Sequence, residues 1–331
     1  MFVKSERTTF GVVVMSGGEA KKRNKVVSGG SSEIAKLFMD KDAKKRYDSF
    51  IVKRPLLIER GVYLDELVGR VDSLEILRAR KWEPLCDVNV DDKTYVELVK
   101  FFYANVHEYN ENELTFKTLV MKKSITISPD LISNILKIDR PDILENFIVF
   151  LYSSKEQAPE MATVIQRICI GSVSWENEKS KIAHIDLTPT YRMINRIVAC
   201  NIHLRGHIVE IGYDTAQLLY TIAEREVIID LPHYIFNNVR ETSTVEDGRP
   251  CLPFSILVSK ILKHNGVEFQ QNDIFIYPIN PLDMGILNKS VGAILGVKRG
   301  KRVKQATAVP QVMGSQAGTS QVGSNAGISE G

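Results

Sequence analysis

Apolar residues recur at intervals of three and four along most of this chain, which is the spacing of one face of an α-helix. The clearest example follows Asp91 and Asp92, whose short carboxylates accept hydrogen bonds from the free amides of a first helical turn. Repeated along the chain, this spacing predicts eight or more helices. The apolar face of the example consists of Tyr95, Leu98, Val99 and Phe102.

Two short runs in which apolar and polar residues alternate follow this helix, at 114–120 and 125–127. Alternation is typical of a strand with one buried face, so the runs predict a small β-hairpin that turns near Lys122-Lys123. Because neither lysine favours a positive φ, we do not expect a tight primed turn there. The apolar residues of the two runs are Leu114, Phe116, Val120, Ile125 and Ile127.

A capping residue followed by proline marks the start of two further helices. The hydroxyl of the first residue accepts a hydrogen bond from the first turn, and proline fits the first helical position because its missing N–H is not needed there. A glycine, Gly266, is expected to end a later helix. The two capped starts are Ser128-Pro129 and Thr188-Pro189.

These elements predict a mainly α fold, a multi-helix globular domain with a small β-hairpin, flanked by disordered tails. The tails follow from composition, because segments rich in Gly, Ser, Lys or Gln do not bury enough apolar surface to offset their chain entropy. We therefore expect a disordered basic N-terminal segment at 1–46 and a helical domain at 47–297. A tail that is first basic and then Gly/Ser/Gln-rich is expected at 298–331.

Charge is distributed unevenly over the 331 residues. Residues 1–46 carry +6 and residues 298–331 carry +4; because the whole chain carries +3, residues 47–297 carry −7. An acidic body with basic ends favours nucleic-acid contact only through the ends. Two basic clusters are candidates for contact with nucleic acid or an import receptor, with a solvated tail as the alternative for each. They are Lys21, Lys22, Arg23 and Lys25, and Lys298, Arg299, Lys301 and Arg302.

The order of segments between Lys81 and Ile138 resembles a known family. A Trp before a helix is followed by FFYANV, a Val-containing hairpin and Ser-Pro-Asp-Leu-Ile, and later by DLTPTYRMINRIVACNIHL, DTAQLLYTIAEREVIIDLPHYI and LPFSILVSKILKHNGV. This order resembles the "putative plant transposon protein" domain of plant proteins related to retroelements, over about 51–294. The sequence departs from that family at the hairpin, where two lysines replace a Gly-containing turn. The resemblance implies no established catalytic residue.

Cys200, His203 and His207 lie within eight residues and are of types that bind metals. A structural zinc usually needs a fourth ligand, and none is nearby. A packed cysteine, with histidines placed where cations complement a helix dipole, is therefore favoured, and we expect no metal and no cofactor. The cysteines are widely spaced and form no CxxC motif, and no signal peptide is apparent, so we expect reduced thiols in an intracellular protein of the nucleus or cytoplasm. The four cysteines are Cys86, Cys169, Cys200 and Cys251.

Motifs of common catalytic sites are missing from the sequence. It has no Gly-rich phosphate loop, HExxH, GxSxG, Asp-Thr/Ser-Gly, Tyr-x-Asp-Asp or CCHC knuckle. A metal-dependent nuclease would need carboxylates that converge on a metal, and Asp186, Asp214 and Asp230 are candidates. Spacing does not show convergence, and helix capping accounts for Asp186 and Asp214 more simply. We therefore expect that the protein is not an enzyme, and keep a nuclease as the weakest alternative.

The leading hypothesis is a non-enzymatic, retroelement-derived helical module that acts through protein–protein contacts, with self-association as one form of them. It rests on the resemblance, the apolar helix faces and the missing catalytic motifs. The alternative is a nucleic-acid-associated protein that uses its basic tails, with weak, salt-dependent and sequence-independent binding. No membrane partner is expected, because no stretch reaches the roughly 18 apolar residues of a membrane helix.

Overall fold

The computed structural model describes residues 37–142, 158–204, 208–224, 227–245 and 251–285. Within these ranges the chain forms nine α-helices and seven β-strands. The helices are α2 Lys41–Arg46, α3 Ser73–Ala79, α4 Val96–Ala104, α5 Pro129–Leu136, α6 Met161–Ile168, α7 Pro189–Ile197, α8 Tyr213–Ala223, α9 Leu231–Thr244 and α10 Ser255–His264. The strands are β1 Thr94–Tyr95, β2 His107–Asn110, β3 Thr115–Val120, β4 Lys123–Ile127, β5 Ile182–Ala183, β6 Glu210–Ile211 and β7 Phe275–Ile276.

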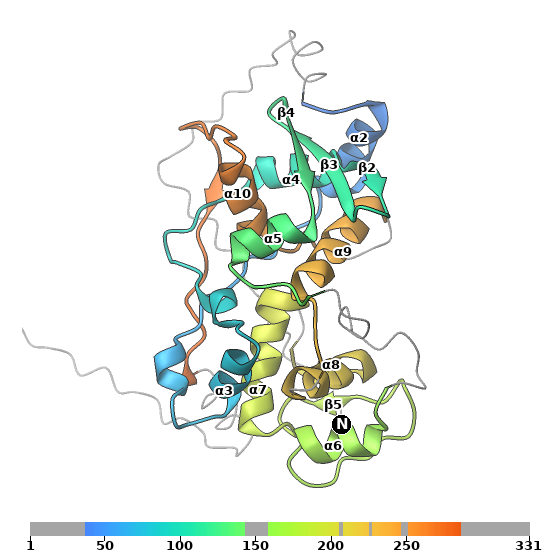
Figure 1. Ribbon diagram of the computed structural model, residues 1–331, viewed down its shortest axis with the longest axis vertical. Helices are drawn as coiled ribbons and strands as arrows, with labels where there is room; N and C mark the ends of the chain where they lie inside the picture. The colour runs from blue at the N-terminus through green and yellow to red at the C-terminus, as the bar shows by residue number, and fades with distance from the viewer. Residues whose placement is uncertain (1–36, 143–157, 205–207, 225–226, 246–250, 286–331) are drawn as a thin grey trace, which may run out of the picture.

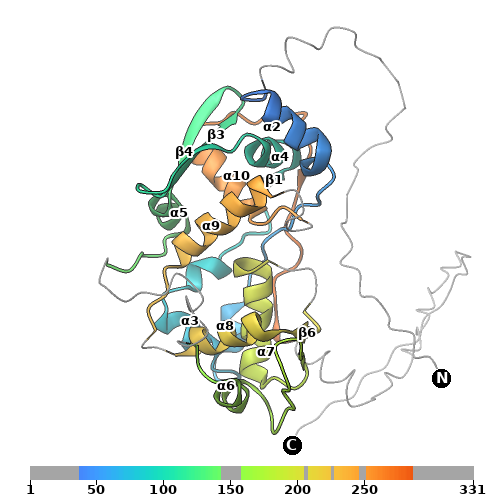
Figure 2. The ribbon, with the colours of Figure 1, turned by 90° about the vertical axis from the view of Figure 1, so that its right-hand side faces the viewer.

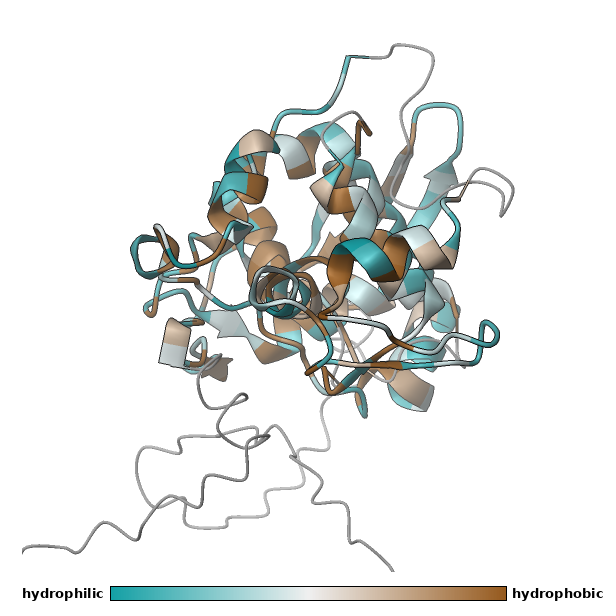
Figure 3. Ribbon diagram, turned by 90° about the horizontal axis from the view of Figure 1, so that it is seen from below, coloured by the Kyte–Doolittle hydropathy of each residue, from teal (hydrophilic) through white to brown (hydrophobic). Residues whose placement is uncertain are grey.

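The elements form two parts, one above the other along the long axis of the molecule (Figure 1, Figure 2). The upper part holds α2, α4, α5, α9 and α10 with strands β2, β3 and β4, and the lower part holds α3, α6, α7 and α8. One cluster of buried apolar residues runs through both parts, from Phe38 to Leu282. Most helices carry both hydrophobic and hydrophilic residues (Figure 3), as expected of amphipathic helices around a shared core.

The expectation of a mainly α fold with one hairpin is wrong, because the fold is mixed α/β. Strands β2, β3 and β4 form a three-stranded antiparallel sheet, and β1 with β7 and β5 with β6 form two further sheets of two strands each. The short strands contain two residues each, too few for an alternating pattern to be recognised in sequence. Their partners are also far apart in the chain, so only tertiary structure brings them together.

Two helix starts are confirmed in atomic detail. Ser128 Oγ accepts a hydrogen bond from Leu131 N at 3.1 Å, and Thr188 Oγ1 accepts one from Tyr191 N at 3.4 Å. In each helix a proline occupies the first turn. The predicted helix end at Gly266 is also confirmed, since α10 stops at His264 and Gly266 has a φ of +67°.

The prediction that Asp91 and Asp92 cap the helix that follows them is wrong. Helix α4 begins at Val96, and its N-cap residue, Tyr95, makes no side-chain capping bond. Asp92 instead accepts a hydrogen bond from Asn89 N and pairs with Lys260 at 3.2 Å. Pairing with β7 holds the residues before the helix in an extended conformation, so the helix starts later than the pattern suggests.

The hairpin is confirmed, but its turn is not the one expected. Strands β3 and β4 pair without interruption up to Val120 and Lys123, which leaves only two residues for the turn. These residues, Met121 and Lys122, have φ values of +48° and +66°. Positive φ at both positions is the signature of a type I′ turn. The continuous ladder on either side therefore overrides the preference of lysine for a negative φ.

The core is built around large aromatic residues. Trp82 is 3% exposed, and Phe102, Phe116 and Phe236 are fully buried. The rings of Phe116 on β3 and Phe236 on α9 stack with their centroids 5.1 Å apart, which joins the three-stranded sheet to the helix beneath it.

The residues that the structure describes include the last ten of the segment 1–46, which was expected to be disordered. Helix α2 spans Lys41–Arg46, and its Ala43 is completely buried. The guanidinium of Arg46 donates to Ala104 O at 2.8 Å, at the end of α4. Residues 37–46 therefore pack on the domain, whereas the expected tails at 1–36 and 298–331 lie outside the described residues.

Candidate functional site

Strand β7 has one paired edge and one open edge. On the paired side the register places Thr94 opposite Ile276 and Tyr95 opposite Phe275. Strand β1 is in turn covered by α10, where Tyr95 N donates to Ser259 Oγ at 3.4 Å. Among the residues that the structure describes, no strand pairs with the opposite edge of β7. An open edge presents unpaired backbone donors and acceptors to another chain.

Exposed apolar side chains are concentrated in and beside β7. Four large apolar residues within six positions are exposed, a concentration that soluble surfaces rarely show in one short segment. We call these four residues the β7 surface. They are Ile274 at 67% exposure, Phe275 at 37%, Tyr277 at 46% and Ile279 at 40%.

An aromatic row supports the β7 surface. Tyr95 stacks on Phe269 with centroids 4.0 Å apart and lies 6.0 Å from Phe275. Phe275 meets Tyr277 edge to face at 5.3 Å, and Lys93 Nζ lies 4.4 Å from the centroid of the Phe275 ring. Neighbouring rings restrict each other's rotamers, so the exposed side chains are held in place before any partner arrives.

Sequence reasoning missed the β7 surface. The sequence feature that corresponds to this surface is the run IFIYPI, in which aromatic and β-branched residues precede a proline. That run predicts a short strand. It does not reveal that the strand pairs with β1 and leaves one edge open.

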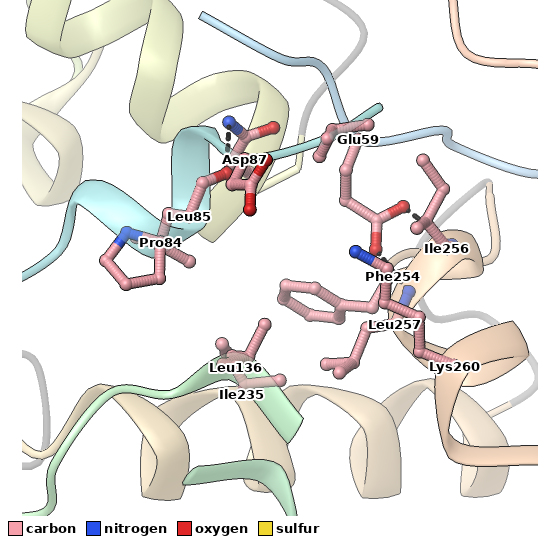
Figure 4. Close-up of a pocket in the computed structure, with 12 residues that line it drawn as sticks. Glu59, Pro84, Leu85, Asp87, Leu136, Ile235, Phe254, Ile256, Leu257 and Lys260 are labelled. Carbon is pink, nitrogen blue, oxygen red and sulfur yellow. Dashed lines mark hydrogen bonds between the residues drawn. The ribbon is translucent and has the colours of Figure 1, made fainter. Parts of the chain in front are cut away.

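A buried carboxylate, that of Glu59, lines a small cavity together with residues of α5, α9 and α10 (Figure 4). Glu59 accepts hydrogen bonds from Ile256 N at 2.8 Å and Leu257 N at 2.9 Å, in the first turn of α10. Burial raises the pKa of Glu59 to about 7, against the opposing effect of these two hydrogen bonds. The N-cap residue Phe254 has no side-chain acceptor, so Glu59 caps the helix from a distant part of the chain.

The cavity beside Glu59 does not have room for a substrate. Its volume is about 30 Å³, close to that of one water molecule. Lys260 and Asp87 lie at its margin, and the rest of its lining is mostly apolar (Figure 4). The geometry supports a structural role for Glu59.

Three arginines cap the C-terminal ends of helices from distant segments. A guanidinium presents several donors to the last carbonyls of a helix, where the dipole also favours a positive charge. Arg80 donates to carbonyls at the end of α8, Arg54 to the end of α9 and Arg46 to the end of α4. The bonds include Arg80 to Thr221 O at 2.7 Å and Ile222 O at 3.0 Å, and Arg54 to Thr242 O at 3.0 Å and Val245 O at 2.9 Å.

The three carboxylates considered for metal-dependent chemistry have separate places in the fold. Asp230 is the N-cap of α9, where it accepts from His233 N, and it also pairs with Arg140. Asp214 lies in the first turn of α8, and Asp186 lies in the loop before α7. Within the described ranges, no three His, Cys, Asp or Glu residues are grouped so as to hold a metal ion.

The candidate metal ligands near the end of α7 are only partly described. Burial raises the pKa of the Cys200 thiol, and His203 Nδ1 is hydrogen-bonded to the hydroxyl of Tyr234. His207 lies outside the described residues.

The two basic clusters also lie outside the described residues, so the structure does not place them relative to the domain. They comprise Lys21, Lys22, Arg23 and Lys25, and Lys298, Arg299, Lys301 and Arg302. No helix in the part of the chain that the structure describes has the length and apolar character needed to cross a membrane.

Comparison with known proteins identifies the family. Residues 78–268 match the model of a family described as "putative plant retrotransposon-related domain". The match covers more than half of the chain, which therefore belongs to this family and confirms the resemblance to a plant retroelement-related domain. No curated protein and no solved structure matches the chain. The matched range contains β1, whereas β7 and its exposed residues follow it.

Proposed function

We propose that this retrotransposon-related chain is a non-enzymatic module that acts through protein–protein contacts, including self-association. The β7 surface carries the proposal, because it combines exposed apolar side chains with an open strand edge. A partner strand added to that edge would gain backbone hydrogen bonds, and the side chains on either face would supply apolar contact. The same proposal holds that the partner is another protein or a second copy of this chain, and that the contact forms in the nucleus or cytoplasm.

A second copy of the chain is the simplest partner for the β7 surface. Antiparallel pairing of β7 with itself is two-fold symmetric, so the same residues serve both sides of the contact. Asp273 precedes the strand and Lys93 lies over the Phe275 ring, whereas the segment between Ile274 and Ile279 carries no charge. Pro278 has no N–H and limits the pairing to a few residues, which suits a reversible contact.

The test measures mass against concentration for the full chain by sedimentation or light scattering. The wild-type mass is expected to rise toward that of a dimer as concentration increases. Ile274→Glu places a charge in the proposed contact and is expected to weaken the association at least about tenfold, since burial of a large apolar side chain contributes about 1.5–3 kcal/mol.

Val209→Glu is the matched control, because Val209 is 69% exposed but lies beside β6, in the other part of the fold. It is expected to associate as the wild type does. A wild-type chain that remains monomeric at high concentration would contradict self-association.

The second candidate function is nucleic-acid binding through the basic clusters. Net charge favours it, since residues 1–46 and 298–331 are positive while the intervening body is negative. Binding is expected to weaken steeply with salt and to show no sequence preference. Replacing the eight basic cluster residues by alanine in the full chain is expected to abolish it, and undiminished binding by that variant would assign the contact to the domain.

A further inference from the structure

Strand β4 forms one margin of the three-stranded sheet and is paired on one side. Its ladder with β3 is unbroken from Lys123 to Ile127, and no strand among the described residues pairs with its other side. At the opposite margin of the sheet the register of β2 is interrupted, and Glu108 there has a φ of +49°. Strand β4 is therefore the more regular of the two edges, and the better template for a further strand.

The register shows which backbone groups of β4 face away from β3. In an antiparallel ladder, hydrogen-bonded and non-hydrogen-bonded pairs alternate, and the pair that closes a two-residue turn is a hydrogen-bonded one. Because Val120 and Lys123 close the turn, Ser124 and Thr126 fall in non-hydrogen-bonded pairs, and their N–H and C=O groups point to the open edge. Both residues are exposed, and no backbone group of the described chain outside the sheet bonds to either of them.

Positive charge is concentrated at the turn end of this edge. Lys122 and Lys123 lie at the turn, and Lys123 Nζ donates to Gly266 O, just after α10. That contact brings the last turn of α10, which carries Lys263, near the β3–β4 turn. Among the described residues these three lysines form no ion pair. Within five positions of them in the chain the one acid is Glu268, so the charge around the turn is net positive.

We propose that the open edge of β4 binds an acidic, extended segment of a partner protein, which joins the sheet as a further strand. Such a strand bonds to the outward N–H and C=O groups of Ser124 and Thr126, and its carboxylates are attracted by the lysines at the turn. Lysine at a strand edge disfavours indiscriminate pairing, so the same charge selects for an acidic strand. This inference rests on the proposed role in protein–protein contacts but uses a different surface from β7.

The experiment titrates the full chain into a short fluorescein-labelled peptide that alternates threonine and glutamate, with fluorescence anisotropy as the signal. Saturable binding is expected, and it is expected to weaken as sodium chloride is added. The same peptide with lysine in place of glutamate is expected to bind at least about tenfold more weakly. A glutamate peptide with methylated backbone amides is expected to lose at least about tenfold as well, because it lacks the N–H donors that pair with the edge.

Hydrogen exchange locates the added strand. The acidic peptide is expected to slow exchange at the amides of Ser124 and Thr126, which face the open edge. The amide of Ile125 is the internal reference, because the register already pairs it with Thr118 on β3. Its exchange is expected to change little when the peptide binds.

Two kinds of variant test the backbone edge and its charge separately. Thr126→Pro removes an outward N–H without removing a bond to β3, so it is expected to weaken peptide binding at least about tenfold. The methylated peptide tests the same backbone contacts on the wild-type chain. Lys122→Glu combined with Lys263→Glu is expected to weaken binding by about tenfold. The control is Lys179→Glu, at an exposed position before β5 in the lower part of the fold, which is expected to bind as the wild type does.

Equal binding of the glutamate and lysine peptides would overturn the proposal, as would unchanged exchange at Ser124 and Thr126. Ile274→Glu, in the β7 surface, is expected to bind the acidic peptide as the wild type does. A wild-type chain that stays monomeric but binds the acidic peptide at this edge would contradict self-association and support the present inference. A chain that self-associates but does not bind the peptide would overturn this inference alone.

Discussion

Arg140 holds Asp230 through two donors, with Nε at 3.0 Å and Nη2 at 2.8 Å from the same carboxylate oxygen. Asp230 is 1% exposed, and its other oxygen accepts from His233 N. The pair therefore joins the loop after α5 to the start of α9, and satisfies a charge that burial would otherwise make costly.

Asp230→Ala is expected to lower the free energy of unfolding by about 3–5 kcal/mol, because it leaves the Arg140 guanidinium without its buried partner and α9 without its cap. Urea denaturation measures the change. Asp130→Ala is the control, since Asp130 accepts from the same arginine at 2.6 Å but its side chain is 81% exposed. That variant is expected to lose no more than about 1 kcal/mol. Equal losses in the two variants would contradict the structural role of Asp230.

Glu59 is expected to make stability depend on pH. Its pKa rises from 4.5 in the unfolded chain to about 7 in the folded protein, so the folded state binds the proton more tightly. The resulting stabilisation is complete below the unfolded pKa and is lost as pH rises toward the folded value. The free energy of unfolding is expected to fall by about 3 kcal/mol between pH 4.5 and 7 from this group.

The measurement is chemical denaturation across that pH range. In Glu59→Gln the contribution of this group to the pH dependence is expected to disappear, because the amide does not titrate. Glu75→Gln, at an exposed position on α3, is expected to retain the wild-type dependence. A Glu59→Gln variant with an unchanged slope would show that other groups are responsible.

The turn between β3 and β4 offers a gain in stability. Met121 and Lys122 both have positive φ, and the residues that favour this conformation are asparagine and glycine. Met121→Asn combined with Lys122→Gly is expected to raise the free energy of unfolding by about 1 kcal/mol. Ser124→Gly, within β4, is expected to lower it, since a glycine in a strand interior loses conformational entropy without relieving strain. If the double substitution is destabilising, the turn has a different conformation in solution.

Local patterns were sufficient where a short segment determines its own structure. Ser128 and Thr188 cap their helices because cap and helix are adjacent in the chain, and the periodic residues of α4 are buried as expected. Family membership also followed from the order of such segments.

These local patterns did not predict contacts between segments that are far apart in the chain. The two-residue strand β1 exists because β7 pairs with it, and α10 is capped by Glu59 from a distant segment. Neither relationship has a local signal, because each depends on which segments the completed core brings together.

The first and last described segments of the chain meet in the fold. Leu57 N donates to Leu252 O, and Tyr63 N donates to Leu282 O, through bridges that link Leu56 to Leu252 and Val62 to Leu282. During synthesis, the residues near 60 therefore leave the ribosome long before the residues that complete their pairing. Their native pairing is therefore completed only after position 282 has been synthesised, and until then this segment is open to contacts with other chains.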